Sequence, residues 1–232
     1  MMDTNNAYTS CCIGQYKCNC FNILSPEEHN YLFSNSVLVK FAKQEMIYKQ
    51  GGLVSNIMLV ESGLVKVFIE NESNVLVLKI ITAGNLLGLT SISEKNNTYQ
   101  YNAMAYVDSV IRQIDINAFR KIVKQNSAFA KEIIDMLNSN SIQINGRFFC
   151  LSHKQSFGRL ADILLCLSER VFKESEFELP LSRKELAELT GLKPETVIRL
   201  LKQFSDEGII HLNGKKINIK DNQTLKKISE KG

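Results

Sequence analysis

The sequence contains no tryptophan, only three prolines and no long run of apolar residues. A membrane-spanning helix needs roughly 18–20 largely apolar residues in a row, so the lack of such a run argues against a helical membrane protein. The first residues lack the basic and apolar regions of a secretory signal peptide, and we therefore expect a cytoplasmic protein without a membrane partner. Neither sign of charge dominates, with 28 Lys and Arg against 24 Asp and Glu, which excludes a chain kept disordered by its own charge.

Hydrophobic residues make up 44% of the 232 residues and charged residues 22%, as in ordinary globular proteins. This length fits two modest domains. The formal net charge of +4 is concentrated at the end of the chain, because residues 180–232 hold 11 Lys and Arg and 7 Asp and Glu, a difference of +4. A basic end on a neutral body is typical of a protein that binds a polyanion.

Short β-branched runs separated by glycine and asparagine occupy residues 37–115. Strands at such close and regular spacing predict an antiparallel barrel or sandwich. The breaks between runs contain Gly51-Gly52, Gly63 and Gly84, which can adopt the positive φ that tight turns require. We therefore predict one compact β module.

After Asn117 the apolar period changes to that of a helix, first in a short stretch and then in one of about 25 residues. One small barrel cannot cover so long an apolar stripe, which predicts a homodimer through a partner helix. A helix packed only between two domains of one chain is the alternative. A further helix over roughly residues 157–172 opens the C-terminal domain. The predicted dimer interface consists of Phe129, Ile133, Leu137, Ile144 and Phe148.

Residues 180–219 hold the most informative pattern in the chain. Ser182 and Glu185 have the spacing of a capping box that begins a helix, and Gly191 ends it. Pro194 then suits the first turn of a second helix, which ends at Gly208. Two helices joined by so short a turn form a helix-turn-helix. The Asn-Gly pair at residues 213–214 predicts a following β-hairpin with a type I′ turn, so the unit is a winged helix.

The second helix has an apolar face and a polar face, since Val197, Leu200, Leu201 and Phe204 share helical spacing. Arg199 on the polar face can donate to guanine O6 and N7, and Glu195 can accept from cytosine N4. Lysines can neutralise phosphates. The alternatives are a surface ion pair between Glu195 and Arg199 and a winged helix that contacts only protein. We predict binding to double-stranded DNA through Arg183, Lys193, Glu195, Thr196, Arg199, Lys202, Lys215 and Lys216.

The run LSRKELAELTGLKPETVIRLL, residues 181–201, resembles the helix-turn-helix signature of Crp/Fnr family transcription regulators, and is nearer the Fnr-like branch. The glycine-containing turns at 49–52, 61–63 and 84–88 resemble those of a cyclic-nucleotide-binding-type β-roll. The resemblance implies that Glu195 and Arg199 read bases and that Arg183 contacts phosphate. Pro194 stands where the cyclic-AMP-receptor branch has an arginine, so the half-site preference of that branch is not expected here.

The resemblance implies an α+β fold with four parts. These are a cysteine-rich tail over residues 1–20, a β-roll sensor domain over 21–125, a dimerisation helix over 126–153 and a winged helix-turn-helix DNA-binding domain over 154–232. A signal in the β-roll would change the spacing of the paired recognition helices so that they match two half-sites about one DNA turn apart. RNA polymerase is a further candidate partner.

The sequence departs from the cyclic-nucleotide-binding members of the family. Those members hold the phosphate with an arginine next to Ser or Thr, but between Gly84 and Ile111 the only basic residue is Lys95. Asn85 also stands where a ribose-binding glutamate is usual. A pocket without a guanidinium cannot pair with the phosphate, so we predict no binding of cyclic AMP.

The six cysteines are unevenly distributed, with four between residues 11 and 20. A reducing cytosol argues against a disulfide framework, and the apolar surroundings of Cys150 and Cys166 predict core positions. Iron–sulfur members of the family use N-terminal cysteines and one internal cysteine, but Ile111 lies roughly where the internal one would fall. An iron–sulfur cluster or zinc held by Cys12, Cys18 and Cys20 is one interpretation. A redox-active thiol pair and a role without chemistry are the others.

No pattern typical of an enzyme is present. The three histidines, His29, His153 and His211, are far apart and form no HExxH motif. The segment from Gly208 to Lys215 resembles a phosphate-binding loop, but five residues separate its glycines instead of four and it falls on the predicted wing. We therefore expect a regulator that is not an enzyme.

Overall fold

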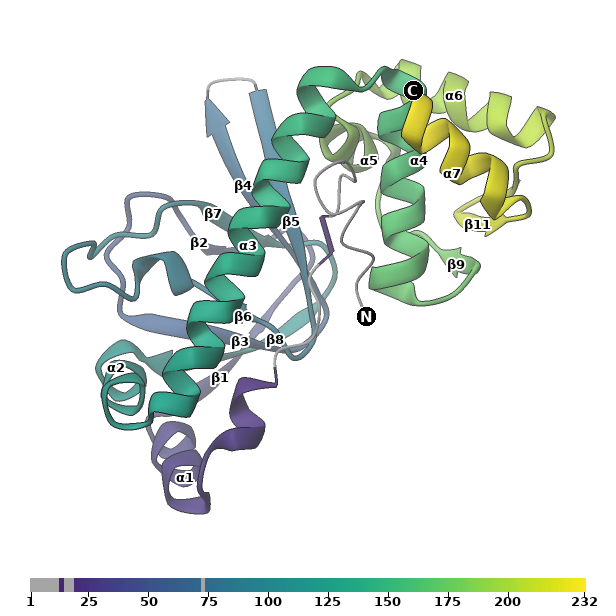
Figure 1. Cartoon of the computed structure of the whole chain (residues 1–232). Coiled ribbons are helices and arrows are strands. Elements are labelled where there is room, and N and C mark those ends of the chain that lie inside the picture. The colour runs from purple at the N-terminus through teal and green to yellow at the C-terminus, as the bar shows by residue number, and fades with distance from the viewer. Residues whose placement is uncertain (1–12, 15–18, 72–73) are drawn as a thin grey trace. The chain divides into compact units, whose positions relative to one another are not determined.

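Two antiparallel sheets of four strands each form the β module, as the alternating runs predict (Figure 1). The computed structural model describes residues 13–14, 19–71 and 74–232. One sheet has the strand order β1-β8-β3-β6 and the other has the order β2-β7-β4-β5. The strands are β1 (Ser36–Phe41), β2 (Met46–Tyr48), β3 (Asn56–Ser62), β4 (Leu64–Asn71), β5 (Asn74–Thr82), β6 (Leu86–Leu87), β7 (Asn102–Ala105) and β8 (Ser109–Asp115).

The turn between β3 and β4 shows why glycine is needed there. Gly63 has a φ of +102°, and a Cβ on it would lie 2.7 Å from the Cα atom of Ser109. No residue with a side chain fits that space without moving the backbone of β8. Apolar side chains from both sheets then fill the interior, among them Met58, Val65, Ala103 and Ile111.

A second apolar cluster lies under the helices that flank the β-roll. A short 3-10 turn, η1 (Cys20–Ile23), precedes α1 (Pro26–Ser34), which begins with a capping box between Ser25 and Glu28. The Asp115 side chain accepts hydrogen bonds from the first backbone amides of α2 (Ile116–Gln125). These helices and the start of α3 (Ser127–His153) bury Leu32, Phe119, Phe129 and Ile133 together with residues of β3 and β8. The 27 residues of α3 confirm the predicted long helix.

The chain divides into two compact units, and the division falls inside α3. One unit contains Gln15–Glu70 and Ile80–Ser141, which include most of the β-roll. The other contains Asn71–Lys79 and Ile142–Gly232, together with residues 13–14. The last three turns of α3 therefore belong to the same compact unit as the C-terminal winged helix.

The winged helix begins with α4 (Ser156–Cys166), which continues as a π-helical turn, η3 (Leu167–Phe172). One strand, β9, precedes the helical pair α5 (Arg183–Thr190) and α6 (Pro194–Asp206), and two strands follow it to complete a three-stranded sheet of order β10-β11-β9. Its strands are β9 (Glu176–Glu178), β10 (Ile210–Asn213) and β11 (Lys216–Ile219). The closing helix α7 (Asn222–Lys231) packs on α4. The α+β architecture with a β-roll, a long helix and a winged helix is confirmed, whereas β9 and α7 were not expected from the sequence.

Candidate nucleic-acid interface

The two ends of α5 have the predicted local structure. The Ser182 side chain accepts a hydrogen bond from the Glu185 backbone amide, and the Glu185 carboxylate accepts one from the Ser182 amide at 2.7 Å. This reciprocal pair is the capping box. Gly191 ends the helix with a φ of +63°, and the Leu192 amide donates back to the Ala187 carbonyl at 3.0 Å. The chain can therefore turn into α6 within two residues.

The inward face of α6 anchors it to the domain. Val197, Leu200 and Phe204 are fully buried and Leu201 is 2% exposed, as their helical spacing predicts. The helix ends at a glycine, since Gly208 has a φ of +73° and the next amide donates to the Phe204 carbonyl at 2.9 Å. Because α6 is fixed along its apolar face, its opposite face has a defined orientation in the domain.

The outward face of α6 presents Glu195, Arg199 and Lys202, and all three side chains are exposed. The alternative of a surface ion pair is not observed, because neither Glu195 nor Arg199 has an ionic or hydrogen-bonded partner among the residues that the structure describes. Ile198 lies between them and is 52% exposed. The predicted set of DNA-contacting residues omits Ile198, although its spacing of three from Glu195 and four from Lys202 places it on this face.

Arg183 lies at the start of α5 and is linked to the wing. Its guanidinium donates a hydrogen bond to the Gly214 carbonyl at 3.1 Å, so the structure brings this residue and the wing turn together. Lys215 and Lys216 follow that turn and are exposed. Lys193 is exposed directly before α6, and Thr196 is half-buried in its first turn. The roles of these residues toward DNA stay predictions.

The wing is a β-hairpin as predicted, but its turn differs. Asn213 pairs with Lys216, so the two loop residues are Gly214 and Lys215. Gly214 has a φ of +61°, whereas Asn213 and Lys215 are not among the residues with positive φ. A type I′ turn needs positive φ at both loop positions, and that prediction is therefore wrong. Glycine at the first loop position is typical of type II′ turns, because only that position then needs positive φ.

The predicted dimer residues on α3 fall into two groups. Phe129 is fully buried and Ile133 is 2% exposed, and both pack in the core of their own unit. They are unavailable to a partner helix, so including them in the interface was wrong. Leu137 and Ile144 are half-buried, and Phe148 is 73% exposed. The sequence pattern alone did not separate the two faces, because apolar residues occur on both.

An accessible seam runs along α3 at the alternating spacing of three and four that coiled coils use. It begins at Ile134, which is 56% exposed, and ends at the half-buried Leu151. Its members are Ile134, Leu137, Ser141, Ile144, Phe148 and Leu151, and all are exposed or half-buried in the single chain.

Of the candidate metal ligands Cys12, Cys18 and Cys20, only Cys20 lies among the described residues. No group of three potential metal ligands occurs among them. Ile111 is fully buried in the β-roll core, where it packs as an apolar residue. Cys20 is buried and disulfide-bonded, contrary to the expectation of reduced thiols, and is therefore not a free thiolate ligand. Cys12 and Cys18 lie outside the described residues, whereas Cys150 and Cys166 are buried as predicted.

The turn that would face a cyclic nucleotide is tied to its own backbone. The Asn85 amide donates to the carbonyl and the hydroxyl oxygen of Thr82, at 3.3 and 3.1 Å, and Asn85 is fully buried. The next arginine along the chain, Arg112, forms an ion pair with Glu61 at 2.5 Å and stacks over the ring of Phe33. The side chains of this region therefore provide no free guanidinium for a phosphate.

Two family models match most of the chain. A Crp-like helix-turn-helix domain matches residues 158–228, and a cyclic nucleotide-binding domain matches residues 38–126. The described helices include none that is long and apolar enough to cross a membrane.

Curated relatives match over most of their length. Electron transport regulator A of Shewanella oneidensis is 26% identical over 188 residues, which cover 79% of this chain and 74% of the relative. Fumarate and nitrate reduction regulatory protein of Yersinia pestis is 26% identical over 192 residues, which cover 81% and 76%. These relatives are regulators and not enzymes, in agreement with the sequence.

Solved structures show the same fold. FixK2 from Bradyrhizobium japonicum matches with a TM-score of 0.77 and 22% identity, covering 83% of this chain and 96% of that one. A CooA variant from Carboxydothermus hydrogenoformans matches with a TM-score of 0.76 and 23% identity, covering 95% and 99%. These structural similarities concern the fold, whereas the helix-turn-helix and cyclic nucleotide-binding models, which together match more than half of the residues, show that the chain belongs to the Crp/Fnr family of transcription regulators.

Proposed function

We propose that this protein is a sequence-specific DNA-binding transcription regulator that acts as a homodimer. The observation that carries the proposal is the outward face of α6, where Glu195 and Arg199 are exposed and have no partner in the described part of the chain. A rigid helix with unpaired donors and acceptors on one face has the chemistry that reads base edges in a major groove.

The basic residues around α6 supply the electrostatic part of binding. Lys193, Lys202, Lys215 and Lys216 are exposed, and Arg183 is held beside the wing turn. Each phosphate that such a side chain neutralises releases counterions, so affinity falls as salt rises. This contribution positions the protein on DNA without reading the sequence.

Ile198 adds an apolar group to the reading face. An isoleucine that is 52% exposed between Glu195 and Arg199 can contact the C5-methyl group of a thymine. We expect Ile198→Ser to reduce the preference for thymine at one base pair in each half-site and to leave the guanine preference set by Arg199 in place. Selection of binding sites from random DNA with both variants measures this, and an unchanged thymine preference would exclude the contact.

The residues of the α3 seam have the spacing that a partner helix in a dimer would need. A partner helix would cover Ile134 and Phe148, which one chain leaves exposed. In the dimer the two α6 helices would face half-sites about one DNA turn apart. The β-roll would receive a signal other than cyclic AMP and shift the dimer toward the arrangement that binds DNA. RNA polymerase is the partner that an activator of this kind would contact.

The test is selection from random double-stranded DNA followed by a gel-shift measurement. A two-fold symmetric site bound at least about a thousandfold more tightly than unrelated DNA supports the proposal. Equal affinity for all sequences, or none, would overturn it and would favour the winged helix as a protein-binding module.

A further inference from the structure

The link between α3 and α4 contains a buried cation. Only Lys154 and Gln155 separate the end of α3 at His153 from the start of α4 at Ser156. A connecting residue with a charged side chain is ordinarily exposed, yet the Lys154 side chain is 7% exposed. Such a lysine needs a partner that compensates for the loss of water around its ammonium group.

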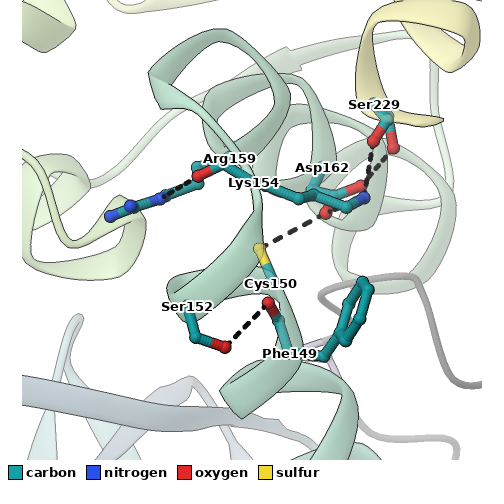
Figure 2. Close-up of polar contacts among 7 residues, drawn as sticks. All are labelled: Phe149, Cys150, Ser152, Lys154, Arg159, Asp162 and Ser229. Carbon is teal, nitrogen blue, oxygen red and sulfur yellow. Dashed lines mark hydrogen bonds and ion pairs between the residues drawn. The ribbon is translucent and has the colours of Figure 1, made fainter. Parts of the chain in front are cut away.

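Figure 2 shows the partners of Lys154. Its Nζ atom donates to the Asp162 carboxylate in α4 at 2.7 Å and to the Ser229 backbone carbonyl in α7 at 2.5 Å. The Ser229 hydroxyl donates to the other oxygen of Asp162. The Cys150 thiol, from the last turn of α3, lies 3.4 Å from the same carboxylate. Three helices and the link thus meet at one buried ion pair and its hydrogen bonds.

A second set of contacts extends from the link to the helix-turn-helix. The Arg159 guanidinium donates to the Lys154 carbonyl at 2.8 Å and to the carbonyl of Gly191, the turn residue between α5 and α6, at 3.4 Å. Leu151 of α3 lies against the same turn, since a Cβ on Gly191 would be 2.9 Å from its side chain. The end of α3 therefore reaches the base of the recognition helix through named contacts.

We propose that Lys154 is a positioning residue that fixes the recognition helix relative to the end of α3. A buried ion pair adds little net stability over an apolar pair, but it tolerates few geometries because each charge must keep its hydrogen bonds. A slide of α4 or α7 along α3 would separate Lys154 from Asp162 or Ser229. The pair therefore defines one orientation of the winged helix on α3, and with it the distance between the two recognition helices of a dimer. This inference rests on the proposed function.

The test compares variants that break this geometry with one that breaks a surface pair. Lys154→Met with Asp162→Asn removes both charges of the buried pair together. Arg159→Gln removes the link to Gly191 and leaves the buried pair in place. Lys226→Met is the matched control, because it removes the exposed ion pair between α7 and Glu169 at 3.1 Å. Thermal unfolding and sedimentation check that each variant is folded and dimeric.

Binding is measured on the site selected by the wild type, on the same half-sites with the spacer one base pair longer or shorter, and on unrelated DNA. We expect the double variant and Arg159→Gln to lose about tenfold in affinity for the selected site and most of their discrimination between spacers. The affinity of both variants for unrelated DNA should stay within about twofold of the wild-type value. All affinities measured for Lys226→Met should also stay within about twofold of the wild-type values. A merely structural role would not change the preferred spacer.

If both variants kept the spacer preference of the wild type, the positioning role would be overturned and the proposed function would stand. If the double variant did not fold, Arg159→Gln would decide the question alone. A wild type without any preferred site would overturn both proposals.

Discussion

At the scale of single residues, Arg199 and Lys202 lie on the same exposed face of α6 but have different expected roles. Arg199 can make two parallel hydrogen bonds to one guanine, worth about 1–3 kcal/mol of discrimination. We therefore expect Arg199→Ala to weaken binding to the selected site and to relax the preference at one base pair in each half-site. Lys202→Ala should weaken binding to all DNA sequences alike. It should also lower the slope of log affinity against log salt concentration by roughly one unit. Selection with each variant and a salt titration measure the two effects, and an unchanged preferred sequence for Arg199→Ala would show that the reading residue was misassigned.

Lys79 in β5 gives a residue-scale prediction about pH. Burial lowers the pKa of Lys79 from its ordinary value of 10.5 to about 8, and no acidic side chain pairs with it in the described part of the chain. Below pH 8 Lys79 is charged in both the folded and the unfolded chain, but its ammonium group has lost surrounding water only in the folded chain. Between pH 8 and 10.5 the unfolded chain binds more protons, so stability rises with pH there.

Lys79→Met should therefore raise the free energy of unfolding by about 1–3 kcal/mol at pH 7, and this gain should shrink toward pH 10. Denaturant unfolding at both pH values measures it. Lys40→Met, at an exposed position in β1, is the control and should change little. An equal gain at pH 7 and pH 10 would contradict the assigned cause.

At the scale of elements, α3 has one face that belongs to its own unit and one that is left accessible. Ile134 and Phe148 are on the accessible seam, whereas the neighbouring Ile133 is 2% exposed in the core. We expect the pair Ile134→Glu and Phe148→Glu to yield folded monomers, because the charges would face the partner helix. Ile133→Glu should instead destabilise the fold by about 3–5 kcal/mol, since it buries a charge. Sedimentation and thermal unfolding distinguish the two, and a stable dimer of the first variant would refute the seam.

At the scale of the whole molecule, the chain has a cyclic-nucleotide-binding type of β-roll in which two polar side chains that could face a ligand are engaged with their own chain. Asn85 is engaged with Thr82, and Arg112 pairs with Glu61. We expect calorimetry to show no binding of cyclic AMP at physiological concentration, because the described side chains at this turn offer the phosphate no guanidinium to replace its lost water. A dissociation constant of about a micromolar or below would contradict this expectation.

Local interactions explain what the sequence by itself determined. The capping box of Ser182 and Glu185, the glycine at residue 191 and the apolar spacing in α6 depend on residues a few positions apart, and all are present as predicted. The order of strands, long helix and winged helix follows from the period of the apolar residues in the same way. The face of α6 that could read DNA therefore follows from the amino-acid sequence alone.

Only the tertiary structure decided which apolar residues of α3 are covered and which charges are buried. Ile133 and Ile134 are adjacent and chemically identical, yet one is in the core and the other is accessible, because the helices of the β-roll unit cover one side of α3 only. Lys154 reads as a surface lysine in the sequence, and its partners Asp162 and Ser229 are 8 and 75 residues away. Contacts between residues so distant in the chain depend on how whole elements pack, and no local pattern contains that information.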